Sequence, residues 1–100
     1  MGWATDHIRR LLNGETVSFR PRGNSMSGRV ESGQLCTVEP IGETPIKVGE
    51  IVLCKVGGDQ YLHLVKAVQG NRVQIGNNHN HINGWTPITK VFGRLIKVAP

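Results

Sequence analysis

Ser25 stands in a segment whose composition favours a sharp turn. Residues 20–28 (RPRGNSMSG) place Gly23 and Asn24 directly before this serine. Both residue types adopt unusual backbone angles at low cost, so the chain can present the Ser25 hydroxyl on a tight turn. The backbone N–H groups of Asn24 and Ser25 could then converge on one point and stabilise an oxyanion. The pattern predicts a serine nucleophile, and an ordinary surface turn is the alternative that this segment leaves open.

A histidine 38 positions later is the candidate base for this serine. His63 lies in the middle of an apolar segment, residues 60–66 (QYLHLVK), which predicts a strand. Imidazole is the side chain best suited to accept a proton near neutral pH. Lys66 is the competing base, because a desolvated lysine can also activate a serine. Residues three apart on a regular strand point to opposite faces, so only one of the two can reach Ser25. A partly buried structural histidine is the alternative.

The most polar stretch of the chain, residues 76–87, contains four asparagines and two histidines. It is too polar for a core strand and long for a connection, and such loops often carry function. His79 and His81 could bind a metal ion together with His63. No carboxylate or cysteine in the loop completes a ligand shell, so solvated histidines are the simpler interpretation. The sequence indicates no metal and no cofactor.

The remaining elements follow from periodicity and turn residues. Ile8, Leu11 and Leu12 predict a helix over 5–13, which Thr5 or Asp6 could cap and Gly14 could end. Gly, Pro and Asn then interrupt the chain every eight to twelve residues. This rhythm predicts a single domain over 1–100, with an N-terminal helix in 1–14 and a small, mostly antiparallel β domain over 16–98. Strands are predicted over 16–20, 34–40, 49–56, 60–68, 72–75 and 89–98.

The bulk composition narrows the class of protein. The net charge is +5, but Arg9-Arg10 is the only adjacent basic pair and there are five aromatic residues, so nucleic-acid binding is not the expected main function. Residues 51–54 form the longest apolar run, which is too short for a membrane helix of about 20 residues. No signal-peptide core is found, and a cytoplasmic location is expected. Cys36 and Cys54 fall in predicted strands and are expected to be buried, reduced thiols.

Five short motifs, taken in order, resemble the signal peptidase and SOS-repressor protease superfamily. The resemblance covers residues 19–98, and it is closest to the type that uses a histidine base. The family's nucleophile box is matched by Gly23-Asn24-Ser25-Met26, and its Gly-Asp-(Ile/Val)-Val strand by Gly49-Glu50-Ile51-Val52. The strand that carries the base is matched by Leu62-His63-Leu64-Val65. The Gly-Asp-Asn box is matched by Gly76-Asn77-Asn78, and the Val-x-Gly-Arg strand by Val91-Phe92-Gly93-Arg94.

The resemblance implies a fold of the repressor-protease and signal-peptidase type and a serine endopeptidase acting on an extended peptide or protein substrate. Ser25 would be the nucleophile, His63 the base, and Met26 part of the substrate groove. An exposed sheet edge would bind the peptide as an added strand and would also allow a homodimer.

The chain departs from the family at the third catalytic position. Histidine-type members have an acidic residue in or after the Gly-Asp-Asn box, but Asp6 and Asp59 are the only aspartates here and lie outside it. The histidine orienter would be one of the loop asparagines, namely Asn77, Asn78, Asn80 or Asn83. An asparagine can hold the imidazole tautomer but supplies no negative charge. A catalytically weak or inactive peptide-binding module of the same fold is therefore the alternative function. Preprotein processing and self-cleavage of the SOS type are not expected, since the chain has neither a membrane anchor nor an Ala-Gly or Cys-Gly bond.

Overall fold

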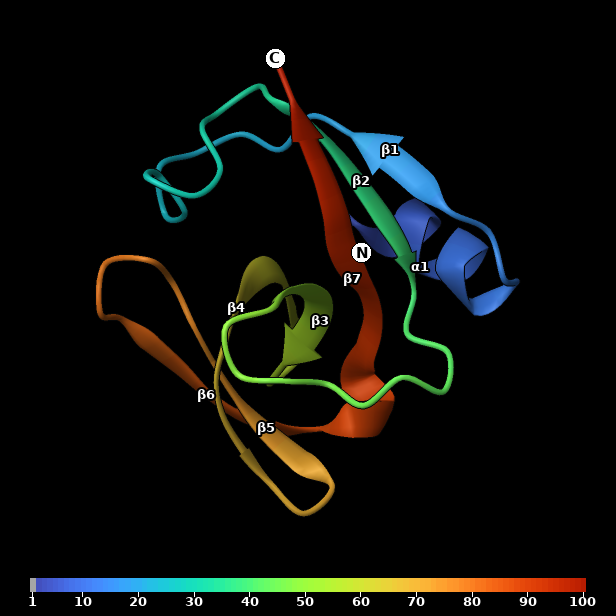
Figure 1. Cartoon of the computed structure of the whole chain (residues 1–100), viewed down its shortest axis with the longest axis vertical. Coiled ribbons are helices and arrows are strands. Elements are labelled where there is room, and N and C mark those ends of the chain that lie inside the picture. Colours follow the sequence, from blue (N-terminus) through green and yellow to red (C-terminus); the bar gives the residue numbers. More distant parts are fainter. Residues whose placement is uncertain (1) are drawn as a thin grey trace.

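Seven β-strands and one short α-helix make up the protein, in a computed structural model that describes residues 2–100 (Figure 1). The mostly β class with an N-terminal helix, predicted from the sequence, is confirmed. In chain order the elements are α1 Thr5–Leu12, β1 Val17–Phe19, β2 Leu35–Pro40, β3 Ile51–Val56, β4 Asp59–Gln69, β5 Arg72–Gly76, β6 Ile82–Pro87, the 3-10 helix η1 Ile88–Lys90 and β7 Val91–Ala99.

All seven strands belong to one antiparallel sheet with the order β1-β2-β7-β3-β4-β5-β6. The four strands from β3 to β6 are joined by successive hairpins. The last strand, β7, then pairs with β2 on one side and β3 on the other. In Figure 1, β7 runs between the part formed by α1, β1 and β2 and the part formed by β3 to β6. The insertion of β7 therefore joins the N-terminal third of the chain to the hairpins.

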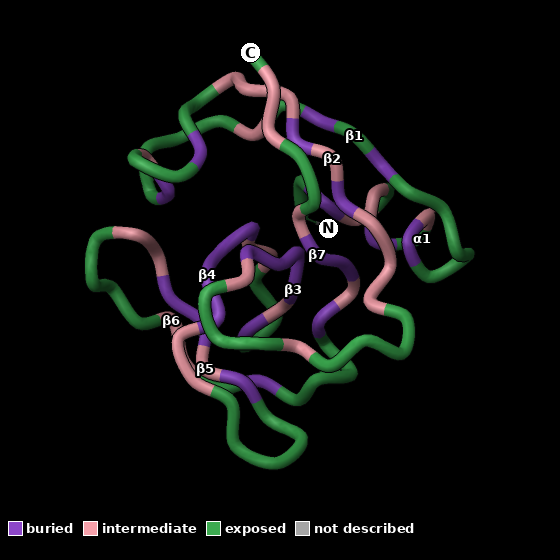
Figure 2. Tube along the Cα trace, in the orientation of Figure 1, coloured by how far each residue is buried: buried purple, intermediate pink, exposed green. Residues whose placement is uncertain are grey.

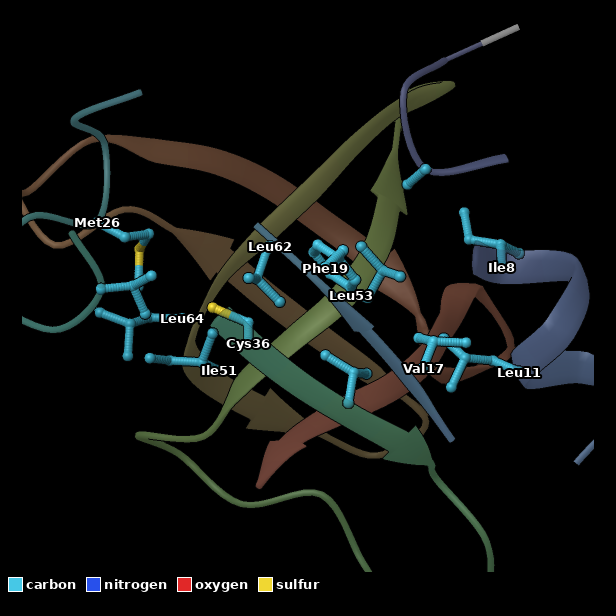
Figure 3. Packing of buried hydrophobic residues seen from close by; sticks show 13 residues of the cluster. Ile8, Leu11, Val17, Phe19, Met26, Cys36, Ile51, Leu53, Leu62 and Leu64 are labelled. Atoms are coloured by element: carbon cyan, nitrogen blue, oxygen red, sulfur yellow. The ribbon is translucent and has the colours of Figure 1, made fainter. Parts of the chain in front are cut away.

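Strand β3 lies at the centre of the sheet and is buried on both faces (Figure 2). Ile51 and Leu53 belong to one hydrophobic cluster, whereas Val52 and Cys54 belong to a second. This alternation follows from the two-residue period of a strand. It explains why residues 51–54 form an unbroken apolar run rather than an alternating one. Figure 3 shows the first cluster, which extends from Met26 and Leu64 at one end to Ile8 and Leu11 at the other.

Helix α1 covers the first cluster with Ile8 and Leu11, and Ala4, which directly precedes the helix, is also buried there. The close approach of α1 to β7 requires a glycine, because a Cβ atom at Gly93 would lie 2.6 Å from Val38 Cγ1 and 3.0 Å from Leu11 Cδ1. Among residues 2–100, no helix is both long and apolar enough to cross a membrane.

The predicted cap of this helix is wrong. Ala4 occupies the N-cap position, and no side chain caps the helix there. The Thr5 hydroxyl instead accepts hydrogen bonds from the Gly2 N–H at 3.2 Å and from Gln60 Nε2 at 2.9 Å. The hydroxyl is thereby used to fix the N-terminal segment against β4. The predicted end of the helix is correct, since Gly14 follows with a φ of 84°.

Residues 76–87 do not form the long loop that their polar composition predicts. Their second half is β6, which pairs with β5 and forms an edge of the sheet. Polar residues exclude a core strand, but an edge strand has one side free and tolerates them. Only Thr86 of this strand is buried. The true loop is the short segment 77–81.

The two cysteines are buried and unpaired, as expected from the sequence. Cys36 packs in the first hydrophobic cluster and Cys54 in the second. Burial raises the pKa of Cys54 to about 12 and raises the pKa of Cys36 as well. Both side chains therefore act as small apolar residues.

Candidate functional site

The segment between β1 and β2 presents Ser25 on an exposed turn. Gly23 has a φ of 112°, which favours glycine, and the chain then coils tightly. The Ser27 N–H donates to the Asn24 carbonyl at 3.1 Å, and the Val30 N–H donates to the Met26 carbonyl at 2.8 Å. The buried side chains of Met26 and Val30 anchor this coil to the core. The hydroxyl of Ser25 is thus held out on a supported turn, as its neighbours in the sequence predict.

His63 meets this serine from β4. Its Nε2 lies 3.1 Å from Ser25 Oγ, which is within hydrogen-bond distance. The imidazole is buried, with 7% of its surface exposed, and it stacks on Tyr61 with ring centroids 4.9 Å apart. The structure therefore brings together the two residues that the sequence singles out 38 positions apart. No hydrogen bond joins Lys66 to Ser25 among the described residues.

Asn83 is the third member of the arrangement. Its Oδ1 lies 2.8 Å from His63 Nδ1. An amide oxygen only accepts, so Nδ1 carries the proton and the neutral ring leaves the Nε2 lone pair for the Ser25 hydroxyl. The position of Asn83 depends on an irregularity in β6, because Ile75 pairs with Gly84 and Gly76 pairs with Ile82. Asn83 is the extra residue between these pairs, and such bulges often redirect a side chain.

The other three candidate asparagines do not orient His63. The Asn77 carboxamide folds back on its own loop, where its Oδ1 accepts from the N–H groups of His79 and His81 at 2.7 and 3.0 Å. Asn80 occupies the left-handed region with a φ of 66°, which makes the turn of the loop. Asn78 contacts the serine segment rather than the histidine. Of the four asparagines that the sequence offers as alternatives, Asn83 is therefore the one that contacts His63.

Loop 77–81 clamps the serine turn. The Asn78 N–H donates to the Ser25 carbonyl at 3.0 Å, and Asn78 Nδ2 donates to the Ser27 carbonyl at 2.9 Å. Ser27 Oγ lies 2.7 Å from His79 Nε2. In Figure 1 the two loops lie on the same side of the molecule. The contact between Ser27 and His79 has no signal in the sequence, because only the proximity of the two loops creates it.

Burial tunes His63 toward the neutral form. It lowers the pKa of His63 below its ordinary value of 6.5, the hydrogen bond to Asn83 opposes this change, and the nearby His81 lowers the pKa further. A neutral imidazole is the state that can accept a proton from a serine hydroxyl. The lowered pKa therefore leaves His63 neutral at neutral pH, which is the state that a general base would require.

The lowered pKa predicts a specific pH dependence of stability. Between the lowered native pKa and the unfolded value of about 6.5, the unfolded chain binds a proton that native His63 resists. The contribution of His63 to the free energy of unfolding is therefore complete above that interval and is lost as the pH falls through it. An NMR titration of the imidazole should give a pKa below 6.5. Asn83→Asp should raise that pKa, because it adds a negative charge beside Nδ1, and an unchanged pKa would contradict the contact.

The turn also offers backbone donors beside Ser25. Among residues 2–100, the N–H groups of Asn24, Ser25 and Met26 donate no hydrogen bond. Free N–H groups of this kind arise wherever a chain begins to coil. N–H groups that converge on one point can stabilise an oxyanion, and this role stays a prediction for Asn24 and Ser25.

A cavity of about 660 Å³ opens beside Ser25 and His63. Met26 lines this cavity, as expected of a groove residue, but only 5% of its side chain is exposed and most of it packs in the core (Figure 3). Its main role is therefore to support the serine turn. Within the described part of the chain, no group of three or more His, Cys, Asp or Glu side chains could hold a metal ion. His79 is instead paired with Ser27.

No protein-family model, curated protein or solved structure matches this chain.

Proposed function

We propose that this protein is a serine endopeptidase that acts on an extended peptide, with Ser25 as nucleophile and His63 as general base. The single observation that carries the proposal is the continuous hydrogen-bonded series from Ser25 Oγ to His63 Nε2 at 3.1 Å and from His63 Nδ1 to Asn83 Oδ1 at 2.8 Å. A nucleophile, a base and a group that orients the base are the three parts of this chemistry. Here they meet beside a cavity that could hold part of a peptide.

The reaction follows from the positions of these groups. Ser25 Oγ attacks the carbonyl carbon of the scissile bond, while His63 Nε2 takes the hydroxyl proton. The resulting oxyanion is held by N–H groups of the serine turn. The imidazolium then gives its proton to the leaving amine, and the C–N bond breaks to leave an ester on Ser25. A water molecule, deprotonated by His63, hydrolyses this ester and regenerates the serine.

Asn83 replaces the acidic residue usual in such sites. Its Oδ1 fixes the tautomer and the orientation of the ring, which are two of the three contributions of an acid. The third contribution, stabilisation of the imidazolium by a negative charge, is absent, since no carboxylate contacts His63 among residues 2–100. The rate is therefore expected to lie below that of an enzyme with a complete triad.

The fold proposed for the β domain is that of the signal peptidase and SOS-repressor protease superfamily. Support comes from the places of the five motifs that resemble this family. The nucleophile box forms the serine turn and the base motif lies on β4, while Gly49-Glu50-Ile51-Val52 leads into β3, which pairs with β4. Gly76-Asn77-Asn78 ends β5 and starts the clamping loop, and Val91-Phe92-Gly93-Arg94 begins β7, which pairs with β3. All five motifs thus surround or support the candidate site.

The second candidate function is peptide binding without cleavage. The observation that favours it is Asn83 itself, because a neutral amide leaves the imidazolium unstabilised. The two functions differ in one covalent intermediate. A peptidase forms an ester on Ser25, whereas a binding module does not.

Trapping that ester is the direct test of the proposal. The chain would be mixed with an activated peptide ester, quenched in acid, and weighed intact by mass spectrometry. We expect the mass of the chain to increase by the mass of the acyl group. In a site without a carboxylate, Ser25 should be acylated by the activated ester faster than the resulting ester on Ser25 is hydrolysed. Digestion with trypsin and fragmentation should place the acyl group on Ser25.

The neighbouring Ser27 provides a matched control. It lies in the same turn and contacts a histidine of its own, His79. Ser25→Ala should abolish acylation, and Ser27→Ala should retain it. An acyl group found on Ser27, or equal labelling of all three chains, would refute the assignment of Ser25 as nucleophile.

A further inference from the structure

The cavity beside Ser25 has an unusually aromatic wall, and part of that wall comes from the N-terminal segment. The side chains that line it include Trp3, His7, Phe19, Tyr61, Leu62 and Met26. Its volume of about 660 Å³ falls within the range of roughly 300–1,000 Å³ that is common for ligand pockets. The cavity is therefore large enough for a bulky side chain together with part of the adjoining backbone.

The N-terminal segment is held in place over this cavity. Trp3 Nε1 donates to the Gln60 carbonyl at 3.2 Å, and the Ala4 N–H donates to Gln60 Oε1 at 2.6 Å. His7 stacks on Phe19 with centroids 4.4 Å apart, and Trp3 lies 5.6 Å from the same ring. Even so, 51% of Trp3 is exposed. A rigidly held tryptophan with an uncovered face offers apolar area at a low entropic cost of binding.

The charges at the cavity are unbalanced. Arg20, Arg22 and Glu31 line it. Glu31 accepts a hydrogen bond from the Gly28 N–H at 2.6 Å, and Arg20 donates to the Gly33 carbonyl at 2.9 Å. Neither arginine forms an ion pair within residues 2–100. Two cations against one carboxylate favour an acidic group on whatever occupies the cavity.

We infer that this cavity is the specificity pocket of the site and that it selects peptides with a large aromatic or aliphatic side chain next to an acidic residue. The inference rests on the proposed function, because it takes a polypeptide to be the ligand. The apolar side chain packs against Trp3, Phe19 and Tyr61 beside the scissile bond, and the carboxylate lies at the rim with Arg22. The N-terminal segment, which lies outside the five motifs, thus supplies a specificity determinant of its own.

The test measures binding separately from cleavage. The chain carrying Ser25→Ala would be incubated with a randomised decapeptide mixture, and the bound fraction would be sequenced by mass spectrometry. We expect enrichment of Phe, Tyr, Trp and Leu adjacent to Asp or Glu. Adding Trp3→Ala should reduce the apolar enrichment about tenfold, the lower end of what an apolar contact contributes to discrimination. Adding Arg22→Gln should reduce the acidic enrichment about two- to fivefold, as expected for an exposed ion pair.

Two variants outside the cavity serve as matched controls. Trp85 is another partly exposed tryptophan, which lies on β6 with the guanidinium of Arg72 over its ring. Arg29 is another exposed arginine in the segment between β1 and β2. Trp85→Ala and Arg29→Gln should each leave the enrichment pattern intact. The inference is overturned if no apolar enrichment is found or if Trp3→Ala leaves it unchanged.

Failure of the proposed function would give a different result. In that case the Ser25→Ala chain would still enrich the same peptides, but the wild-type chain would not cleave them. Cleavage without apolar selectivity would have the opposite meaning, since it would support the peptidase and refute the pocket.

Discussion

His63→Ala is expected to lower kcat/KM for peptide cleavage by at least about 10³-fold. The reason is that Ser25 would lose the group that removes its proton, and removal of the base in a serine hydrolase costs this much or more. Ser25→Ala should cause a loss of the same order. The double variant should be no worse than either single one, because the two residues act as a unit. The rate of cleavage of one fluorogenic peptide, measured for the wild type, the two single variants and the double variant, checks these three expectations.

The competing base provides the control for this prediction. Lys66 lies on the same strand, at the irregularity between Val65 and Ala67, and makes no hydrogen bond with Ser25 among residues 2–100. Lys66→Met should therefore leave kcat/KM within about threefold of the wild type, the scale of a change outside the site. Loss of activity in Lys66→Met with retention in His63→Ala would exchange the two assignments.

The pH dependence adds an independent readout of the same base. In the wild type, kcat/KM should rise with pH through an apparent pKa below 6.5 and then stay high, because burial keeps the imidazole neutral. Asn83→Asp should move this midpoint upward and raise the plateau by roughly 10- to 100-fold. This is less than the factor of about 10⁴ that a triad aspartate contributes, because Asn83 already holds the tautomer. A plateau unchanged in Asn83→Asp would show that the imidazolium is not formed in the rate-limiting step.

Leu53→Ala is expected to give the largest loss of stability, about 2–5 kcal/mol in the free energy of unfolding. Leu53 lies on the central strand β3, is fully buried, and belongs to the cluster that supports both α1 and the serine turn. Truncation of Leu53 removes apolar contacts and leaves a cavity. Strand β3 cannot move to close this cavity, because it is paired with β4 on one side and with β7 on the other. The melting temperature should fall by about 10 °C or more, given about 4–8 °C per kcal/mol for a chain of this size.

Urea unfolding followed by circular dichroism would check this value. Leu12→Ala is the matched control, since Leu12 is the same residue type but has 69% of its surface exposed. It should change the free energy of unfolding by about 0.5 kcal/mol or less. Equal losses in the two leucine variants would mean that the first cluster is not the main source of stability.

Much of the fold follows from local sequence patterns. The apolar run at residues 51–54 predicts a strand, and the Gly57-Gly58 turn predicts the hairpin from β3 to β4, because apolar runs and turn residues are features of neighbouring positions in the sequence. Strand β6 has no comparable local signal in its sequence. Its polar residues are compatible with a loop, and only its pairing with β5 makes it a strand.

The candidate site divides in the same way. Residue types and backbone freedom identify Ser25 as a presented hydroxyl and His63 as a base on a rigid strand, and these features are local. The choice of Asn83 among four asparagines is not local, because it depends on a bulge in a strand two places away from β4 in the sheet. The contribution of Trp3 to the cavity is equally non-local, since it requires the N-terminal segment to pack against Gln60 of β4. Sequence alone determined which side chains could react, and the pairing register and long-range packing decided which of them meet.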